Sequence, residues 1–408
     1  MRTIVFIETN KSGSSREAIK AAERLGYFTV LLTNKKNFIH QRTEFPDVHQ
    51  MILVELFNYD KLKENIINLQ KQDKQIKCVL SFVHSYVYLA ATLSEEFCPS
   101  VVSSDPIFLM ENKILCRDLL IDLPISPHYA VYTPDHSLEN FIDKHKGYLP
   151  LIVKAPTSAG SKDVLLANDE NQLKLAIQKL LNHREQILLE EYLAGPQYLI
   201  EVLVHDGKVH IIAIIEQQIT FLQRFIVTGY CLLRDNEKSL YDSILETVTS
   251  ILKVFQLKNG ACHLEMRLVN GSWKLIEINP RISGGAMNRI IEVGYGINLV
   301  EETIQLMLGN EPCLTRKHSK YVYAHYLTVD SKGVLIKVTG KNRSSNYPGV
   351  EEVYIKSRKG QILQPPLSMG DRYGYILASS DVKDEAIRIA KKAASEIRFN
   401  LAPIVNTE

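Results

Sequence analysis

The segment Lys-Leu-Ile-Glu-Ile-Asn-Pro-Arg, which ends at Arg281, carries polar side chains at alternating positions. In a β-strand this spacing places Glu277, Asn279 and Arg281 on one face and Ile276 and Ile278 on the other. A carboxylate and an amide oxygen are hard ligands suited to magnesium. A fixed guanidinium beyond the metal suits a transferring phosphoryl group or a developing oxyanion. The segment therefore predicts a metal site beside an anion-holding cation.

A second carboxylate lies in the strand-like segment that precedes this one. The turn Asn270-Gly271 separates two apolar runs and is a strong hairpin signal, which would bring Glu265 opposite Glu277. Two buried carboxylates side by side repel, and a divalent cation relieves that repulsion. The alternative is an exposed ladder of Glu and Arg on a two-faced sheet. The Asn-Pro-Arg sequence and the turn after it favour the metal site.

That turn is Ser283-Gly284-Gly285-Ala286, and it opens into an expected helix over residues 287–293. A turn of small residues at a helix start can present free backbone N–H groups to an anion. By itself, the turn is better explained as a flexible loop without such a role. The charged segment before it is what favours an anion-binding turn.

Lys154 ends an apolar strand over residues 151–154, and the small-residue loop 157–164 follows it. Burying a lone lysine is costly unless the ammonium meets an anion, and a phosphate would supply one. The loop is small enough for its backbone to approach phosphate oxygens, but it is not the GxxxxGK[ST] phosphate-binding loop. The alternative is an edge strand whose lysine reaches water.

Two further segments carry a weaker signal. The run Glu190-Glu191-Tyr192-Leu193 passes from an apolar strand into a Gly-Pro break, and such a hinge could read the edge of an adenine. A plain strand end with solvated acids explains it equally well. Lys113 lies at what reads as an ordinary helix start and predicts no chemistry by itself.

The bulk composition limits the function. A chain of 408 residues is too long for one compact core, so two to three domains are expected. The formal net charge of +2 is too small an excess of positive charge to indicate binding to nucleic acid or an anionic membrane. No apolar run reaches the roughly 20 residues that span a bilayer. The six scattered cysteines contain no CxxC pair, which argues against a zinc site or a redox dithiol and favours reduced thiols in the cytoplasm. Serine hydrolase and zinc protease motifs are missing.

The secondary-structure pattern changes along the chain. The first hundred residues alternate between strands and helices, which predicts parallel βαβ units. Their expected elements are strands at 3–7, 27–32, 78–83 and 100–102 and a helix at 16–25. The block from about 106 to 310 predicts antiparallel sheet with helices, with strands at 151–154, 187–190, 198–204, 209–215, 261–268 and 273–278 and helices at 170–181 and 239–255. The remainder predicts strands at 321–329, 334–339, 352–354 and 373–379 and a helix at 383–398.

The order of these segments along the chain resembles the ATP-grasp superfamily. The segments are Lys113, the Ile-Val-Lys strand with its glycine-containing loop, Glu-Glu-Tyr-Leu, a Glu strand and Glu-Ile-Asn-Pro-Arg. The resemblance implies an α/β plus α+β architecture over essentially the whole chain. It divides the chain into an N-terminal parallel α/β domain (1–105), an ATP-grasp small lobe with the hinge (106–195), a large lobe with the metal site (196–310) and a C-terminal strand-rich subdomain that completes the large lobe (311–408).

The resemblance also implies roles for single residues, with ATP and Mg²⁺ as cofactors, two ions being expected and Mn²⁺ a possible replacement. Those implied to hold or cover ATP are Lys113, Ile152, Lys154, Ser158, Gly160, Ser161, Glu190, Glu191, Leu193 and Ile276. Glu265 and Glu277 would bind one metal ion, and Glu277 with Asn279 a second. Arg281, with the turn Ser283, Gly284 and Gly285, would hold the carboxylate substrate and stabilise the acyl phosphate and its adduct. Gln197 and Arg267 depart from the family pattern.

Within the superfamily, Asn-Pro-Arg-Ile-Ser-Gly-Gly and the segment from Leu367 to Ala378 look most like the bacterial L-amino acid ligases. This resemblance implies formation of a dipeptide from two unprotected amino acids through an aminoacyl phosphate, with Gly284 and Gly285 leaving a roomy acceptor site.

The alternatives are another ATP-grasp carboxylate–amine ligase, a biotin-carboxylase-like or purine-pathway enzyme, and a nucleotide-binding module without turnover. The expected partners are small amino acids and a second copy of the chain in a homodimer, with no nucleic acid or membrane. Substrate specificity is expected around Ser81, His84, Ser85 and Tyr86, at the C-terminal edge of the first sheet.

Overall fold

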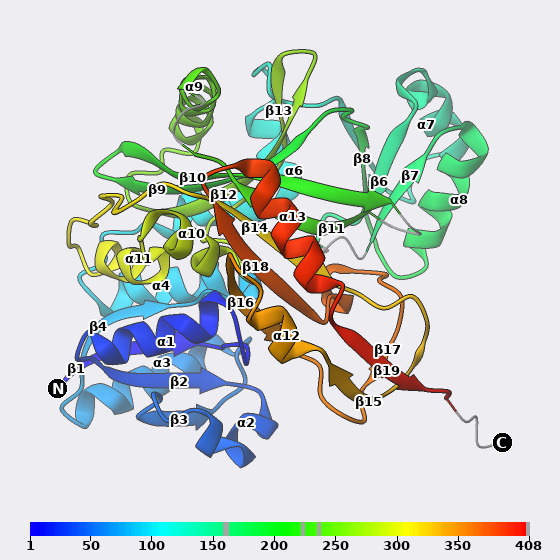
Figure 1. The fold of residues 1–408 in the computed structure, drawn as a ribbon. Coiled ribbons are helices and arrows are strands. Elements are labelled where there is room, and N and C mark those ends of the chain that lie inside the picture. Colours follow the sequence, from blue (N-terminus) through cyan, green and yellow to red (C-terminus); the bar gives the residue numbers. More distant parts are fainter. Residues whose placement is uncertain (158–162, 222–224, 235–237, 405–408) are drawn as a thin grey trace.

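The computed structural model describes residues 1–157, 163–221, 225–234 and 238–404, and their strands form four sheets (Figure 1). The first sheet is parallel, with the strand order β3-β2-β1-β4. Its strands are β1 (Arg2–Ile7), β2 (Phe28–Thr33), β3 (Gln50–Leu53) and β4 (Gln75–Leu80). The helices of this part are α1 (Ser14–Arg24), α2 (Lys36–His40), α3 (Tyr59–Lys71) and α4 (Val87–Phe97). The predicted βαβ units are therefore confirmed.

The strand predicted at residues 100–102 does not form. The Ser100 hydroxyl donates to the carbonyl of Val102 at 3.0 Å and accepts from its N–H at 3.2 Å. These local hydrogen bonds compete with a strand ladder. Two helices follow this turn, α5 (Ser104–Glu111) and α6 (Lys113–Leu119), and α6 begins at the lysine flagged in the sequence.

The second sheet is antiparallel, with the order β5-β8-β6-β7. Its strands are β5 (Tyr129–Tyr132), β6 (Leu151–Lys154), β7 (Val164–Ala167) and β8 (Ile187–Glu191). Helices α7 (Leu138–His145) and α8 (Glu170–Leu181) lie beside it (Figure 1). Leu151 and Val153 belong to the core shared with these helices, so strand alternation turns Ile152 and Lys154 to the opposite face.

The third sheet has eight strands in the order β13-β12-β9-β10-β11-β14-β18-β16. They are β9 (Gln197–His205), β10 (Lys208–Phe221), β11 (Phe225–Leu232), β12 (Gly260–Val269), β13 (Ser272–Asn279), β14 (Tyr321–Leu327), β16 (Val350–Ile355) and β18 (Gly374–Ser380). Strands from the predicted ranges 196–310 and 311–408 thus share one sheet. The four domain ranges themselves stay a prediction.

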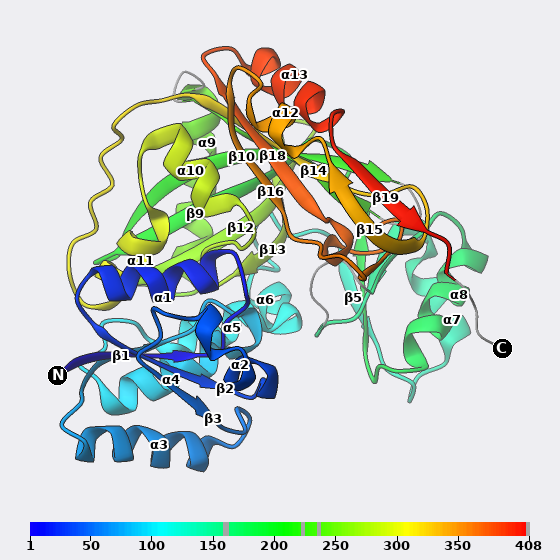
Figure 2. The same ribbon diagram turned by 60° about the horizontal axis from the view of Figure 1, so that its bottom comes forward.

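Helices cover both faces of this large sheet. On one face α9 (Lys238–Val254) and α13 (Lys383–Ala394) contribute to one core. On the other face α10 (Met287–Tyr295) and α11 (Leu299–Met307) share a core with the N-terminal sheet. Figure 2 shows α1 beside these two helices, so the N-terminal part packs directly on the large sheet's layer.

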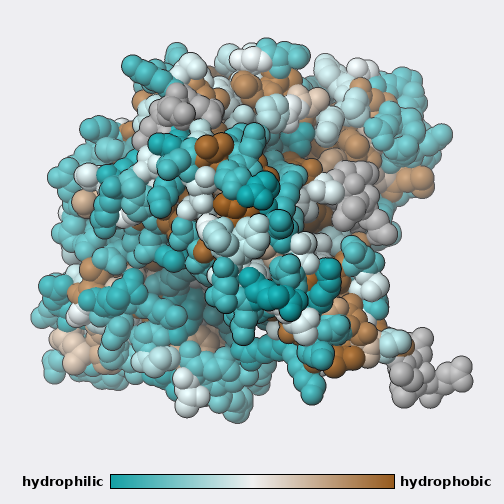
Figure 3. Space-filling model, in the orientation of Figure 1, coloured by the Kyte–Doolittle hydropathy of each residue, from teal (hydrophilic) through white to brown (hydrophobic). Residues whose placement is uncertain are grey.

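The end of the chain differs from the prediction of one helix over 383–398. Helix α13 ends at Ala394, and β19 (Arg398–Ala402) pairs with β15 (Gly333–Thr339). With β17 (Ile362–Leu363) they form the fourth sheet, near the short helix α12 (Lys341–Ser345). The face in Figure 3 is largely hydrophilic, with small scattered apolar areas. Among the helices described, none is long and apolar enough to cross a membrane.

The β12–β13 hairpin forms as predicted. Asn270 and Gly271 have φ values of 49° and 80°, a left-handed conformation that matches the twist of the flanking strands. Glu265 pairs directly with Glu277. The register then shifts, because the next residue on β12, Met266, pairs with Leu275 and leaves Ile276 as the extra residue of a β-bulge.

Candidate active site

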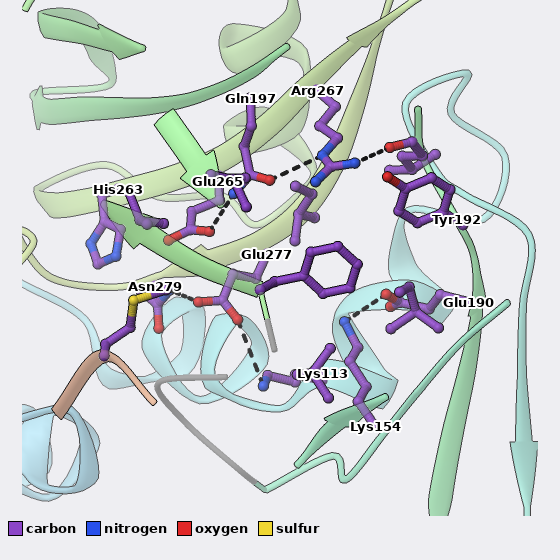
Figure 4. Close-up of a pocket in the computed structure, with 18 of the residues that line it drawn as sticks. Lys113, Lys154, Glu190, Tyr192, Gln197, His263, Glu265, Arg267, Glu277 and Asn279 are labelled. Carbon is purple, nitrogen blue, oxygen red and sulfur yellow. Dashed lines mark hydrogen bonds and ion pairs between the residues drawn. The ribbon is translucent and has the colours of Figure 1, made fainter. Parts of the chain in front are cut away.

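A cavity of about 280 Å³ lies between the second and third sheets, and His84 of the N-terminal part also lines it. Figure 4 shows basic residues of α6 and β6 on one side and acidic residues of β12 and β13 on the other. The predicted site residues that line it are Lys113, Ile152, Lys154, Glu190, Glu191, Leu193, Glu265, Ile276, Glu277, Asn279 and Arg281. Ser283, Gly284 and Gly285 follow Arg281 directly. The predicted positions Ser158, Gly160 and Ser161 lie outside the described residues.

The two paired carboxylates differ in their surroundings. Burial, then the charge of Glu277, raises the pKa of Glu265 to about 7. Burial also acts to raise the pKa of Glu277, but the positive charge of Lys113 and a hydrogen bond from Asn279 outweigh it and bring the pKa to about 2. Lys113 Nζ lies 3.6 Å from Glu277 Oε2, and Asn279 Nδ2 donates to Glu277 Oε1 at 2.9 Å.

This donor set fits a magnesium ion. The two carboxylates and the Asn279 amide oxygen are hard oxygen ligands, and a divalent cation would relieve the repulsion that helps to raise the pKa of Glu265. The described residues contain no group of three or more His, Cys, Asp or Glu side chains that could hold a metal ion. The candidate site therefore consists of two carboxylates and one amide, and the predicted count of two ions stays a prediction.

Lys154 is buried in the second sheet and meets Glu190. Its Nζ lies 2.5 Å from Glu190 Oε2, and the two side chains are 6% and 7% exposed. Burial lowers the pKa of Lys154. The other oxygen of Glu190 accepts from Arg117 Nε at 2.7 Å. The Glu190 carboxylate is thus occupied by two cations, so its predicted contact with adenine stays a prediction.

The bulge in β13 corrects the simple alternation expected for this strand. Ile276 was expected on the face opposite Glu277, but both side chains line the cavity, whereas Leu275 and Ile278 are in the core. A bulge inserts one extra residue and thereby re-aims the side chains around it. The resemblance implies that Ile276 covers ATP, and the bulge is what turns its side chain into the cavity.

The hinge connects to the metal site through the two residues that depart from the family pattern. Arg267 donates to the Leu193 carbonyl and, through Nε, to Gln197 Oε1 at 3.0 Å. Gln197 Nε2 in turn donates to Glu265 Oε2 at 3.0 Å, as Figure 4 shows. The Arg267 guanidinium also lies 5.4 Å from the centre of the Tyr192 ring. Gln197 therefore links Arg267 to Glu265 of the candidate metal site by hydrogen bonds, without a charge of its own.

Glu191 points away from this network, because Oε2 of its side chain accepts from the His128 N–H at 2.7 Å. Its backbone N–H also donates to the His128 carbonyl at 2.9 Å. These bonds fix the hinge strand at its exit, and a predicted adenine contact from the Glu191 side chain is untested.

Arg281 is held by its backbone, while its side chain enters the cavity. Its carbonyl lies 2.8 Å from His263 Nδ1, and because a carbonyl only accepts, Nδ1 carries the proton. Arg281 Nη1 donates to the Ile282 carbonyl at 2.9 Å, but its buried Nε has no partner within the described part of the chain. Burial lowers the pKa of this guanidinium. A buried donor without a partner is costly, so an anion here would satisfy it.

A buried glutamate that the sequence reasoning missed positions the turn after Arg281. Glu201 on β9 is fully buried and accepts from the Ser283 N–H at 3.1 Å and from the Ser283 hydroxyl. The Ala286 N–H donates to the Tyr326 hydroxyl at 3.4 Å. Two of the four N–H groups predicted to face an anion are thus engaged inside the protein. The structure thus gives Ser283 a contact that positions the turn, and an oxyanion role for the N–H groups of Gly284 and Gly285 stays a prediction.

The N-terminal part touches the same turn. Ser14 Oγ donates to the Ser283 carbonyl at 2.8 Å. Gly13 (φ 77°) approaches so closely that a Cβ there would lie 3.2 Å from the Gly285 nitrogen. Within the described part of the chain, a Cβ on Gly284 would meet nothing within 4 Å, whereas one on Gly285 would lie 3.2 Å from the Tyr326 hydroxyl. Of the two glycines expected to leave space, only Gly284 faces an open volume.

Other missed residues gave little signal in the sequence. Arg117 lies four residues after Lys113, a spacing that puts both on one helix face, yet nothing in the pattern marked its buried partner. Glu201 lies within an apolar strand, as Lys154 does, and its burial could have been suspected for the same reason. His84, at the expected specificity region, does line the cavity. Ser81 instead donates to the Ile7 carbonyl within the first sheet.

Comparison with known families agrees with this geometry. Residues 19–97 match an ATP-grasp N-terminal domain, residues 148–289 an ATP-grasp domain, and residues 325–402 an L-amino acid ligase C-terminal domain 2. A solved structure of an L-amino acid ligase from Bacillus licheniformis shares the fold with a TM-score of 0.83 at 20% identity, covering 98% of this chain and 99% of that one.

Among curated relatives, dapdiamide A synthase from Enterobacter agglomerans is 23% identical over 97% of this chain and 95% of its own length. An L-arginine-specific L-amino acid ligase from Bacillus subtilis is 22% identical over 52% of this chain, and the match spans about half of that protein, 54%.

The fold and the cavity define an ATP-grasp enzyme, and the chain belongs to the ATP-grasp superfamily. Within that superfamily it is an ATP-dependent carboxylate–amine ligase similar to the L-amino acid ligases.

Proposed function

We propose that this enzyme joins two unprotected amino acids into a dipeptide through an aminoacyl phosphate, releasing ADP and phosphate. The γ-phosphoryl group of ATP passes to the carboxylate of the first amino acid. The amine of the second then attacks the acyl carbon, loses a proton, and displaces phosphate. The rest of the active site must hold the charges of these steps and keep water out.

The residues of the cavity suit these tasks. Lys113 and Lys154 would hold the phosphates of ATP. Glu265, Glu277 and Asn279 would hold Mg²⁺, which when bound neutralises charge on the transferring phosphoryl group. Arg281 would bind the substrate carboxylate and, with the N–H groups of the 284–285 turn, stabilise the oxyanion of the adduct.

The observation that carries this proposal is Arg281. Among the described residues its buried Nε has no partner, and a Cβ on Gly284 in the turn beside it would meet none of their atoms within 4 Å. A buried guanidinium next to open space suits a carboxylate substrate. Because Gly284 has no side chain, the turn leaves space for a second amino acid. The match of residues 325–402 to the L-amino acid ligase domain supports amino acids over bicarbonate or a purine precursor as substrates. The homodimer and the cytoplasmic location stay predictions. The six free cysteines support the cytoplasmic location.

The test measures phosphate release from ATP and Mg²⁺ with each of the twenty L-amino acids, singly and in pairs, with mass spectrometry of the products. The expected result is amino-acid-dependent release and a product mass equal to two residues minus water. Glu277→Gln is the matched control, since it keeps the side chain's size but removes a metal-binding charge. Release with bicarbonate or a nucleotide precursor, and none with any amino acid, would refute the dipeptide assignment and leave the ligase class intact.

A further inference from the structure

Arg117 is the most deeply buried cation close to the cavity that the proposed reaction does not use. It lies on α6, four residues after Lys113, and its side chain is 3% exposed. Its guanidinium reaches two other elements. Nε donates to Glu190 Oε1 on β8 at 2.7 Å, and Nη2 donates to the Ile276 carbonyl on β13 at 2.6 Å. One side chain therefore joins α6, the hinge strand of the second sheet and the metal-site strand of the third.

The contact with Glu190 concerns the phosphate-holding lysine. Lys154 and Arg117 each take one oxygen of the same carboxylate, so two buried cations share one anion. If Lys154 were the only partner, its movement toward a phosphate would leave a buried carboxylate unpaired, which is strongly unfavourable. Because Arg117 remains on Glu190, Lys154 can turn to a phosphate without that penalty. The surplus positive charge also favours an anion in the cavity.

The contact with Ile276 concerns the metal site. Ile276 is the extra residue of the bulge, and the register shift removes it from the regular ladder with β12. The carbonyl of such a residue needs another partner when it is buried. Arg117 Nη2 supplies that partner and thereby holds the bulge that turns Ile276 and Glu277 into the cavity.

We propose that Arg117 is a positioning residue that sets Lys154, through Glu190, and Glu277, through the bulge carbonyl, toward the same nucleotide. Arg117 itself contacts no reacting atom. The inference rests on the proposed roles of Lys154 and Glu277 toward ATP and Mg²⁺, but not on which substrates are ligated.

The test uses Arg117→Lys in the full-length enzyme. Lysine keeps the charge but cannot donate to both Glu190 and the Ile276 carbonyl from a planar fork. Affinity for a non-hydrolysable ATP analogue is measured by calorimetry at several Mg²⁺ concentrations, beside steady-state kinetics. We expect at least tenfold weaker analogue binding, an at least threefold higher Mg²⁺ requirement, and a KM for ATP that rises while the KM for the other substrates changes less than twofold.

The matched control is Arg16→Lys. Arg16 is also buried and ion-paired, in this case with Asp47 in the N-terminal part, and neither residue lines the cavity. It should lower thermal stability to a similar degree and leave analogue binding and the Mg²⁺ requirement unchanged. If Arg117→Lys does not fold, Glu190→Asp tests the same link, because the shorter carboxylate cannot keep both cation contacts, and it should weaken analogue binding in the same way.

The inference would be overturned if Arg117→Lys kept its analogue binding and its Mg²⁺ requirement within twofold of wild type. If only Glu190→Asp folds, the same result in that variant would overturn it. The same losses in the Arg16→Lys control would also overturn it. Addition of guanidinium at low millimolar concentration to Arg117→Ala should restore part of the analogue affinity, which a general loss of stability would not show. A wild-type enzyme that binds the analogue but ligates no amino acids would refute the dipeptide function and leave the Arg117 result interpretable.

Discussion

Replacing Glu201 by glutamine should change how the stability of the protein depends on pH. Glu201 is fully buried, and it accepts hydrogen bonds from the N–H and hydroxyl of Ser283. Burial raises its pKa to about 7, above the ordinary value of 4.5. The hydrogen bonds from Ser283 act in the opposite direction but do not outweigh the burial. Glutamine keeps the size and an acceptor oxygen and cannot ionise.

The sign of the effect follows from proton binding. Between pH 4.5 and about 7 the unfolded chain has already released the Glu201 proton while the folded chain keeps it, so stability falls as the pH rises through this window. Above about pH 7 the loss is complete. The gap between the two pKa values corresponds to about 3 kcal/mol, as an upper limit, at about 1.4 kcal/mol per pH unit. The Glu201→Gln variant should lack this loss.

The measurement is urea unfolding of wild type and Glu201→Gln at pH 4.5 and pH 8. The difference between the two proteins should move in favour of the variant by about 2–3 kcal/mol from the lower to the higher pH. Using this difference cancels other buried acids, such as Glu111 and Glu265, whose pKa values burial also raises to about 7. The exposed Glu246 provides the control, since Glu246→Gln should run parallel to wild type. A parallel course for Glu201→Gln as well would refute the reasoning.

Three further changes have defined outcomes. Arg281→Ala should lower kcat by roughly 10²–10³, as loss of an oxyanion donor does, and a loss below threefold at saturating substrates would exclude that role. Removal of divalent metal with EDTA should abolish phosphate release; Mg²⁺ or Mn²⁺ should restore it in wild type but not in Glu277→Gln, and full activity in EDTA would refute the metal site. Gly340→Ala should destabilise the protein by several kcal/mol in denaturant unfolding, because φ is 88° and the new Cβ would lie 1.8 Å from the Glu396 carbonyl oxygen. The Cβ of Gly147→Ala would meet no described atom within 4 Å, so this variant should be neutral, and equal stability of the two variants would contradict the prediction.

The parts of the fold that the sequence predicted well are those with local causes. The Asn270-Gly271 turn fixed the hairpin register, so the pairing of Glu265 with Glu277 could be predicted and is confirmed. The helix expected over 170–181 runs from Glu170 to Leu181, because its apolar positions repeat at helical spacing and Asp169 caps its start.

The missed features depend on contacts between distant segments. The bulge at Ile276 is stabilised by Arg117, which is 159 residues away in the chain, and no periodicity along β13 reveals it. The burial of Glu201 becomes meaningful only when Ser283, 82 residues further on, lies against it. The strand at 398–402 was not predicted, and only its first residue fell within the helix expected over 383–398, because its partner, β15, lies some sixty residues earlier. Such pairings need the tertiary structure.

The close approach of Gly13 to Gly285 restricts how this enzyme can be recombined with its relatives. The loop before α1 and the turn after Arg281 are separated by some 270 residues, yet their backbones touch and share the Ser14–Ser283 hydrogen bond. A chimaera that takes its first hundred residues from one ligase and the remainder from another would join two surfaces not shaped for each other beside the turn that follows Arg281. The loop and the turn should therefore be exchanged as a pair, and a side chain introduced at position 13 should alter catalysis although it belongs to neither ATP-binding lobe.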